Sequence, residues 1–415
     1  IYTLSLHDAL PISTSGTGKT RLAMALVAVV VILAVGVYLN SMQKPSESRQ
    51  AKTSDADAAN PNTPEKNPAK SADGNIELVA SYKADVSGNN AWCAPLQICW
   101  DQMRNTTNAG QALEPTADAP TEGRSLADAL NAGTFETTRL SDALWYSYAG
   151  PMNAEARRQI EEAIAQKFNQ KSDILDKLNW QSANENMLLF YAMLYHTFSF
   201  EHPFALSPEK GGFGENPEAN VSYFGTEDAP DDQRRDLLAQ VTPLYYSSSD
   251  DCACTVKTKE GDLLVLVKKP KGSSFSEIWT NAMAAAQTGD HRPLSNKEDF
   301  SCPKLDVDIL TTYRALEGLT FDVTDGRKLK IAQAMQTLKM TLDNEGGSVK
   351  SEAAITAELT SLDPQGLRTF RFDDSFALFL VDGKATGNVT GDGSLSSDAQ
   401  PYLALLVNDA KLWRG

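Results

Sequence analysis

Residues 187–204 read MLLFYAMLYHTFSFEHPF. The run Met187–Phe198 within this stretch is apolar almost throughout, and Pro203 follows it closely. Because strands that are covered on both faces read as nearly continuous apolar runs, the stretch predicts a β-strand buried on both sides. It therefore indicates a sheet that lies inside the protein.

Further strands are predicted mainly in the C-terminal half. Asp262–Lys268 (DLLVLVK) is a second buried strand, and Lys269–Gly272 is a turn after it. Leu305–Ile309 is a short alternating strand, and the two late runs Phe376–Val381 and Tyr402–Val407 are also of β type.

Helices are predicted mainly before these strands. Ala154–Phe168 (AEARRQIEEAIAQKF) carries an apolar stripe on one face, and Asn153 stands where it can cap the helix. The stripe consists of Ala156, Ile160, Ala163, Ile164 and Phe168. Shorter helices are expected over Asp173–Trp180, Phe275–Ala285 and Thr311–Leu316, and Leu329–Asp343 is expected to begin as a helix and end as a strand. Helices early and strands late are typical of the α+β class.

The N-terminus does not read as part of this fold. Ile1–Ile12 (IYTLSLHDALPI) resembles, from Tyr2 onward, a translated sequencing adapter, so we interpret it as an artefact; the alternative is a genuine N-terminus. Residues 13–21 are then a short cytoplasmic segment. Ser15–Thr20 (SGTGKT) resembles a phosphate-binding loop, but Ser13 replaces the first glycine of that motif and no strand precedes it. Nucleotide binding is not expected.

Leu22–Leu39 (LAMALVAVVVILAVGVYL) is a candidate membrane segment. It contains no charge and just reaches the roughly 18 residues needed to span the hydrocarbon core. Lys19 and Arg21 precede it, so the positive-inside rule places everything after Leu39 outside the cytoplasm. We interpret it as an uncleaved, single-pass signal anchor with an extracellular C-terminal domain. The alternative is a cleaved signal peptide and a secreted protein.

Composition separates a linker from a folded domain. Residues 40–74 consist almost wholly of Ser, Pro, Asn, Ala and charged residues, which cannot bury enough apolar surface to order the chain. They predict a disordered linker, and residues 75–415 remain for the domain. The formal net charge of -16 argues against nucleic acid as a partner.

Residues able to carry catalysis are few. The five cysteines are an odd number, and a Cys252–Cys254 disulfide would be strained by its short spacing. A Cys93–Cys99 disulfide is conceivable, but free thiols that pack as small apolar groups are the preferred interpretation. The histidines form no zinc-binding pattern, and no G-x-S-x-G motif is present. The sequence thus favours a binder or inhibitor over an enzyme, with no metal and no cofactor.

Eight segments, in this order, resemble the serpin family over most of Asn75–Asp409. Asn89–Ile98 (NNAWCAPLQI) resembles the N-x-F-x-S-P-L-S-I start of an early helix, and Met193–Phe204 resembles A-I-Y-F-K-G-K-W-E-x-P-F. The other matching segments are Asp262–Lys269, Cys302–Leu305, Leu316–Phe321, Ile331–Gln336, Leu342–Gly346 and Phe372–Leu380. The resemblance implies an α+β, serpin-like fold, with helices of the N-terminal half packed on a large central, mostly antiparallel sheet and a protruding reactive loop.

The resemblance also implies a mechanism and a set of loop residues. A protease cleaves the loop and is held as an acyl-enzyme while the N-terminal half of the loop inserts into the sheet as a new strand. The implied hinge residues are Gly346, Ser351, Glu352, Ala353, Ala354 and Thr356, with residues 347–350 as an insertion before the T-E-A-A-A-T-like segment. Counting along the family's loop places the scissile bond near Pro364–Gln365. Leu362, Leu367 and Arg368 would suit chymotrypsin-, elastase- and trypsin-like proteases respectively.

Other positions depart from the family pattern. The family's paired serines are Ala94 and Gln97 here, and its asparagine, tryptophan and histidine are Ala192, Phe200 and Gln336. In the family these residues build the polar network that lets the sheet open, so their replacement implies a different network or a sheet that stays closed. The sequence therefore predicts a monomeric, extracytoplasmic inhibitor of serine-type proteases. The alternatives are a non-inhibitory serpin-fold protein, a plain protease substrate and an unrelated exported α+β binding domain.

Overall fold

The computed structural model describes residues 75–413, except for residues 185, 348–366 and 392. These residues belong to one compact unit, residues 66–415. The predictions of an artefact, a cytoplasmic segment, a signal anchor and a linker over residues 1–74 lie outside the described part. No helix within that part is long and apolar enough to cross a bilayer.

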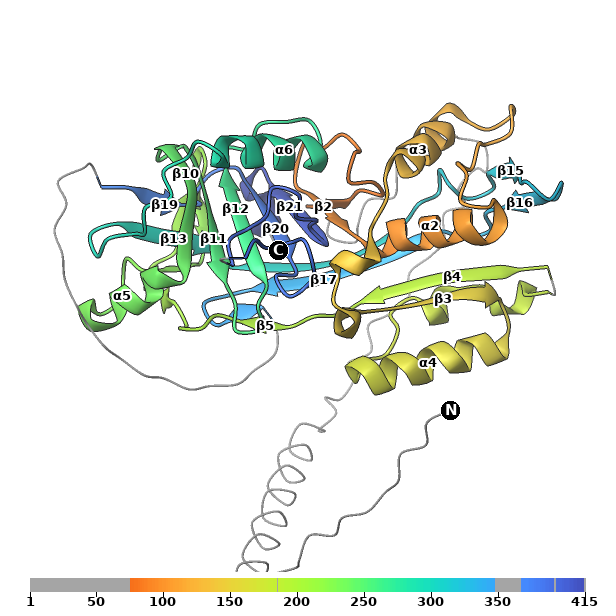
Figure 1. Ribbon diagram of the computed structural model, residues 1–415, viewed down its shortest axis with the longest axis horizontal. Helices are drawn as coiled ribbons and strands as arrows, with labels where there is room; N and C mark the ends of the chain where they lie inside the picture. The colour runs from red at the N-terminus through yellow and green to blue at the C-terminus, as the bar shows by residue number, and fades with distance from the viewer. Residues whose placement is uncertain (1–74, 185, 348–366, 392, 414–415) are drawn as a thin grey trace, which may run out of the picture. The chain divides into compact units, whose positions relative to one another are not determined.

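The α+β class is confirmed, since the described part combines α-helices with β-sheets (Figure 1). The α-helices of the described part are α2 (Pro95–Thr107), α3 (Thr121–Ala132), α4 (Ala154–Phe168), α5 (Asp231–Ala239) and α6 (Phe275–Ala286). The bounds predicted for α4 are confirmed. The side chain of Asn153 accepts a hydrogen bond from the amide of Ala156, as expected of a cap, and four of the five stripe residues are buried, whereas Ala163 is half-buried.

The largest sheet has seven strands. Their order is β1-β2-β21-β20-β12-β11-β10, and only the β1–β2 pair among them is parallel. The strands are β1 (Glu77–Leu78), β2 (Asn90–Cys93), β10 (Val241–Ser248), β11 (Asp251–Lys257), β12 (Leu263–Lys268), β20 (Phe376–Val381) and β21 (Leu403–Val407). The strands predicted from the apolar runs Asp262–Lys268, Phe376–Val381 and Tyr402–Val407 correspond to β12, β20 and β21. They are consecutive in the sheet, in the order β21-β20-β12, and lie at its centre.

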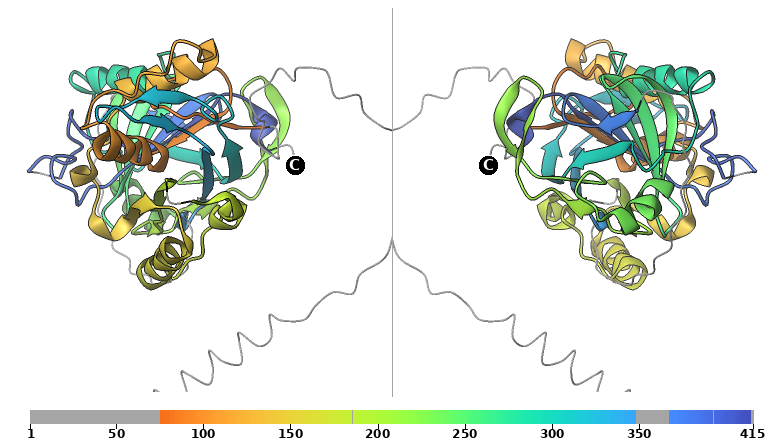
Figure 2. Two further views of the ribbon diagram at one scale, coloured as in Figure 1. Left: turned by 90° about the vertical axis from the view of Figure 1, so that its right-hand side faces the viewer. Right: turned by 90° about the vertical axis from the view of Figure 1, so that its left-hand side faces the viewer.

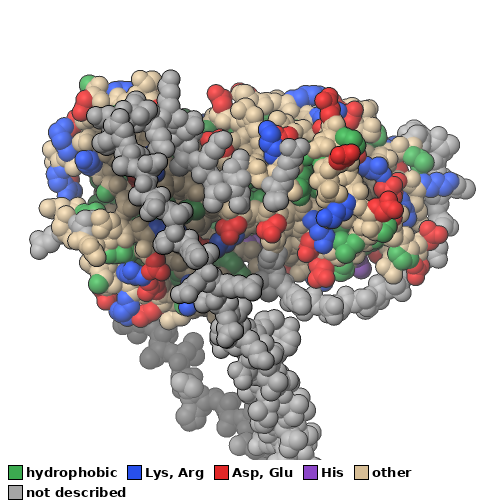
Figure 3. Space-filling view, turned by 180° about the vertical axis from the view of Figure 1, so that it is seen from behind, with side chains coloured by type: hydrophobic (Ala, Val, Ile, Leu, Met, Phe, Trp, Pro, Cys, Tyr) green, Lys and Arg blue, Asp and Glu red, His purple; other side chains and the backbone are tan. Residues whose placement is uncertain are grey.

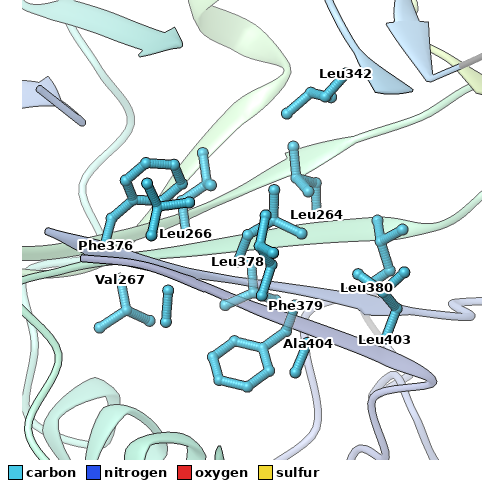
Figure 4. Close-up of a cluster of buried hydrophobic side chains, with 14 of the residues drawn as sticks. Leu264, Leu266, Val267, Leu342, Phe376, Leu378, Phe379, Leu380, Leu403 and Ala404 are labelled. Carbon is cyan, nitrogen blue, oxygen red and sulfur yellow. The ribbon is translucent and has the colours of Figure 1, made fainter. Parts of the chain in front are cut away.

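Both faces of this sheet are covered, which explains the continuous apolar runs. Every residue of β12 and β20 is buried. On one face Phe379 packs against Trp279 of α6, with ring centroids 5.1 Å apart. On the other face Phe376 packs against Phe372 at 5.9 Å. Figure 4 shows these apolar side chains projecting from both faces of the central strands.

Smaller strand groups surround the seven-stranded sheet. A four-stranded sheet has the order β19 (Thr369–Arg371), β13 (Asp299–Pro303), β9 (Tyr223–Gly225) and β6 (Ala205–Leu206). Five two-stranded pairs are formed by β3 (Trp145–Pro151) with β4 (Leu188–Leu194), β5 (Phe198–Ser199) with β18 (Gly346–Gly347), β7 (Gly211–Phe213) with β8 (Asn216–Val221), β14 (Leu305–Thr312) with β17 (Met335–Leu342), and β15 (Thr320–Asp322) with β16 (Lys328–Lys330).

The helices lie on different sides of these strands. Figure 1 shows α2 and α4 on opposite sides of the β3–β4 pair. The two side views in Figure 2 show α6 and α4 on opposite sides of the folded part. On the rear face, acidic and basic side chains are interspersed (Figure 3).

Two predicted elements around β4 are wrong in detail. Met187–Phe198 is not one strand buried on both faces but β4 and β5, and β4 is only partly buried because it pairs with β3 along one edge and borders a cavity along the other. Asp173–Trp180 contains the 3-10 turn Leu175–Lys177, and a second turn begins at Trp180. The Ser172 hydroxyl accepts hydrogen bonds from the amides of Ile174 and Leu175, and such local bonds compete with a helix in a short segment.

Two later helix predictions are also wrong. Thr311–Leu316 does not form a helix, because β14 continues through Thr312 and Thr311 pairs with Gln336. Leu329–Asp343 ends as the predicted strand, β17, but its first part contains β16 and an irregular segment instead of a helix. In both cases pairing with a distant strand outweighs a local helical pattern.

Candidate functional site: a cavity between two strand pairs

The site begins with two strand edges that face one another. Within the described residues, β4 pairs only with β3, and β17 pairs only with β14. In an antiparallel pair, alternate residues direct their backbone N–H and C=O groups away from the partner strand. β4 and β17 therefore each carry a row of backbone donors and acceptors on the edge that borders the cavity described next.

A cavity of about 1110 Å³ lies between β4 and β17, and it is named the inter-strand cavity from here on. Its wall includes every residue from Leu188 to Leu194 and from Met335 to Thr341. Because the cavity follows both strands, its shape suits an extended chain. This arrangement can accept another strand, which would bond to both rows of backbone groups.

One wall of the cavity comes from α2. Leu96, Cys99, Trp100 and Met103 of this helix line the cavity. Pro95 occupies the first turn of α2, where its missing N–H has no cost. Leu96, Trp100 and Met103 also belong to a core cluster that includes Leu113, Leu130 and Phe321, so this wall is well supported.

The opposite wall comes from residues 170–187, which connect α4 to β4. Ile174, Leu178 and Met187 of this connection line the cavity. Two contacts tie the connection to the region of β17. The Lys339 ammonium donates a hydrogen bond to Asp173 at 2.9 Å, and the Asn179 amide donates to Gln333 Oε1 at 2.8 Å.

The two strand pairs are joined at one end of the cavity. Gly346 and Gly347 of β18 pair with Ser199 and Phe198 of β5. Gly346 has a φ of 137°, and a Cβ at this position would lie 2.3 Å from the carbonyl oxygen of Phe198. Glycine is required here, since the backbone conformation and the close approach both exclude a side chain. The predicted hinge residue Gly346 thus lies where β17 turns back toward β5.

Most predicted loop residues lie outside the described part. These are Ser351, Glu352, Ala353, Ala354, Thr356, Leu362, Pro364 and Gln365. The described residues on either side belong to different sheets, because Gly347 pairs with β5 whereas Thr369 begins β19 beside β13.

The two described scissile candidates differ sharply in exposure. The side chain of Leu367 is 60% exposed, whereas Arg368 is 4% exposed. Arg368 Nε donates to Glu298 at 2.7 Å, and its Nη2 donates to the carbonyl oxygens of Arg292 and Pro293. Leu367 is therefore accessible to a protease, and Arg368 is held inside a hydrogen-bond network.

The positions that depart from the family pattern form a different polar network. Gln336 is buried, donates to the carbonyl oxygen of Cys93 at 3.0 Å and accepts from the Tyr313 hydroxyl at 2.9 Å. It thereby links β17 to the start of α2. Gln97 is also buried, but its amide donates to Asp101 and to the carbonyl oxygen of Leu130, away from β17.

The sequence analysis missed a second buried polar group at the cavity. His196 Nε2 lies 2.5 Å from Asp262 Oδ2, and the Tyr402 hydroxyl donates to Asp262 Oδ1 at 3.2 Å. His196 and Tyr402 both line the inter-strand cavity. Two sequence features could have revealed this group: a histidine inside an otherwise apolar run, and an aspartate directly before a buried strand.

The thiols show no sign of reactivity. All five cysteines are free, and Cys93 and Cys99 line the inter-strand cavity. Burial raises the pKa of both thiols to about 12. They are protonated at neutral pH and act as small apolar groups, as expected from the sequence. The described residues contain no group of His, Cys, Asp and Glu that could hold a metal ion.

Comparison with known proteins yields similarities of fold. No family model and no curated protein matches the chain. Solved structures of similar fold include Serpin48 of the insect Tenebrio molitor, with 11% identity, coverage of 78% of this chain and 92% of that chain, and a TM-score of 0.42. A serpin-12 of Manduca sexta has 12% identity, coverage of 78% and 94%, and a TM-score of 0.44.

A thermophilic serpin, tengpin, in its native state has 10% identity, coverage of 79% and 90%, and a TM-score of 0.46. All three of these solved structures are named as serpins. At these identities the similarity concerns the fold alone.

Proposed function

We propose that this chain is a divergent serpin-like inhibitor of serine-type proteases. A protease cleaves the loop between Gly347 and Arg368, and the freed N-terminal part of the loop inserts between β4 and β17. The inter-strand cavity is the observation that carries this proposal, because it offers two free strand edges and an apolar interior at the point where the loop leaves β18.

The loop sequence fits such an insertion. In an inserted strand, alternate side chains would enter the cavity toward α2, where space is limited by Trp100 and Met103. If the charged Glu352 faces outward, the neighbouring Ala353 faces inward, and it is small enough to slide into a closed core. A large or charged side chain would leave a desolvated group there, at a cost of about 1–3 kcal/mol.

We place this activity outside the cytoplasm, at the cell membrane. The support is the uncharged segment Leu22–Leu39, with Lys19 and Arg21 before it and a polar linker after it. The protein would act as a monomer tethered by this single segment. Protection of the tethered domain from a membrane-impermeant amine label on intact cells would contradict this placement.

The direct test is incubation of the purified full chain, in detergent, with trypsin, chymotrypsin and elastase separately. Denaturing gels and mass spectrometry then follow the products. An adduct that contains the protease, together with a released C-terminal peptide, is the expected result and locates the cleaved bond. Clean cleavage between Ser361 and Thr369 without an adduct would reject inhibition and leave a plain substrate.

A non-inhibitory serpin-fold binding protein is the second candidate. The observation that favours it is Gln336, whose two buried hydrogen bonds tie β17 to Cys93 at the end of β2 and to Tyr313, where the family has a histidine. Cleavage of the loop separates the candidates, because strand insertion raises the melting temperature strongly and a loop that stays outside does not.

A further inference from the structure

The His196–Asp262 pair joins the segment between β4 and β5 to the start of β12. His196 lies between β4 and β5, at the end of the inter-strand cavity where β18 joins β5. Asp262 lies directly before β12 in the seven-stranded sheet. Their 2.5 Å contact therefore connects the end of β4 to the buried central sheet.

Asp262 is deeply buried and has few partners. Its side chain is 2% exposed, against 13% for His196. Among the described residues, its carboxylate has three hydrogen-bond partners, His196, Tyr402 and Thr258. Of these three side chains, only the imidazole can carry a positive charge near neutral pH.

The other charged groups around the pair do not replace this counter-ion. Asp382 and the Cys93 thiol both act on Tyr402, and both are acidic groups. Glu260 accepts a hydrogen bond from the Ser199 amide at 2.7 Å, next to the pair along the chain. The Lys384 side chain lies against Gly261, directly before Asp262, but it is not among the hydrogen-bond partners of the Asp262 carboxylate. Among those partners, His196 alone can supply a compensating positive charge.

We propose that His196 and Asp262 form a proton-dependent latch on the inter-strand cavity. With His196 protonated, a charge-assisted bond holds the end of β4 to the central sheet and slows the separation of β4 from β17. With His196 neutral, the bond is weaker and that end of the cavity opens more readily. The physiological meaning of the latch rests on the function proposed above, but its detection does not.

Hydrogen exchange of the full chain in detergent tests the latch without any protease. The amides of residues 195–200 are followed between pH 5.5 and 8, after correction for the intrinsic exchange rate. We expect about tenfold more protection at pH 5.5 than at pH 8 in the wild-type protein. His196→Phe, which keeps a ring but not the charge, abolishes this dependence. His202→Phe is the matched control and retains it, since the hydrogen bonds between His202 and Gln240 use backbone atoms of His202.

His196→Gln covers the case in which His196→Phe fails to fold. Glutamine can still donate to Asp262 but does not titrate, so protection should become independent of pH. Protection that is equal at pH 5.5 and 8 in the wild type, or pH dependence that survives in His196→Gln, would overturn the latch. An absence of protease adducts together with pH-dependent protection would reject the inhibitor function while leaving the latch in place.

Discussion

The Lys339 ammonium on β17 lies 2.9 Å from Asp173 Oδ1, on the connection between α4 and β4. This hydrogen bond raises the pKa of Lys339 above its ordinary value. Both residues line the inter-strand cavity, so the pair ties β17 to the wall that the connection forms. In the proposed mechanism this wall lies beside the inserting strand. Both side chains are about half exposed, so the pair is sensitive to salt.

We expect Lys339→Ala to accelerate strand insertion while changing the unfolding free energy by less than about 1 kcal/mol. The rate is measured as the gain in melting temperature with time after loop cleavage, and 0.5 M salt should mimic the variant. Lys328→Ala is the matched control, because its ion pair with Asp322 lies in the β15–β16 hairpin. An insertion rate that is the same in both variants and in the wild type would refute this role.

Gln336→Leu should lower the unfolding free energy by about 1–3 kcal/mol, since it leaves the Cys93 carbonyl and the Tyr313 hydroxyl without their buried partner. Urea denaturation measures the loss. Gln336→His, which keeps both a donor and an acceptor, should lose less. Gln166→Leu, on the exposed side of α4, is a control with little expected effect. Equal stability of Gln336→Leu and the wild type would show that the network contributes nothing.

Arg368 should be a structural residue and not a cleavage site. Arg368→Met leaves Glu298 buried without its partner and should cost about 3–5 kcal/mol in urea denaturation, whereas the double variant Arg368→Met/Glu298→Met should recover most of this. In addition, trypsin should not cut the native chain after Arg368. Rapid cleavage at this bond would show that the network opens in solution.

The same pair predicts a dependence of stability on acid. Desolvation alone would raise the pKa of Glu298, but hydrogen bonds from Arg368 and the Ser295 amide outweigh it and lower the pKa from 4.5 to about 2. A carboxyl group whose pKa is depressed by folding stabilises the fold above its unfolded pKa and loses that contribution as the pH falls toward its folded pKa. Unfolding free energy should therefore decrease from pH 5 to pH 2, and Glu298→Gln should flatten this decrease. A slope in Glu298→Gln equal to that of the wild type would assign the effect to other carboxylates.

Ala353→Arg tests the hinge predicted from the sequence. Side chains alternate along a strand, so in the proposed mechanism an outward-facing Glu352 leaves Ala353 facing the core. A charged side chain at this position should block insertion, so the chain should be cleaved without forming an adduct. The ratio of adduct to cleaved chain on a denaturing gel measures the change. Ser361→Arg, farther along the loop, serves for comparison, and an unchanged ratio in Ala353→Arg would place the inserting segment elsewhere.

Elements with a strong local pattern were predictable from the sequence. The apolar runs of β12, β20 and β21 and the capped, amphipathic α4 each carry their signal within a few neighbouring residues. The predicted α+β class follows from these elements.

Where a strand ends depends on partners that the local sequence does not contain. Met187–Phe198 reads as one strand, but β4 stops at Leu194 because β3 pairs with it only to that point, and β5 then pairs with β18. Thr311 and Thr312 read as the start of a helix, but they stay extended because Gln336 and Met335 lie opposite them on β17. In each case a residue far along the chain supplies the hydrogen bonds.

The cavity and its contacts show the same difference between what a local sequence pattern determines and what distant residues decide. Side-chain patterns within single segments sufficed for the class of fold and for the central buried strands, because burial imposes a local pattern. The cavity between β4 and β17, the latch between His196 and Asp262, and the burial of Arg368 against Glu298 were decided by the tertiary structure. They join residues that lie 66 and 70 positions apart or belong to separate sheets, and only the packed chain brings their atoms into contact.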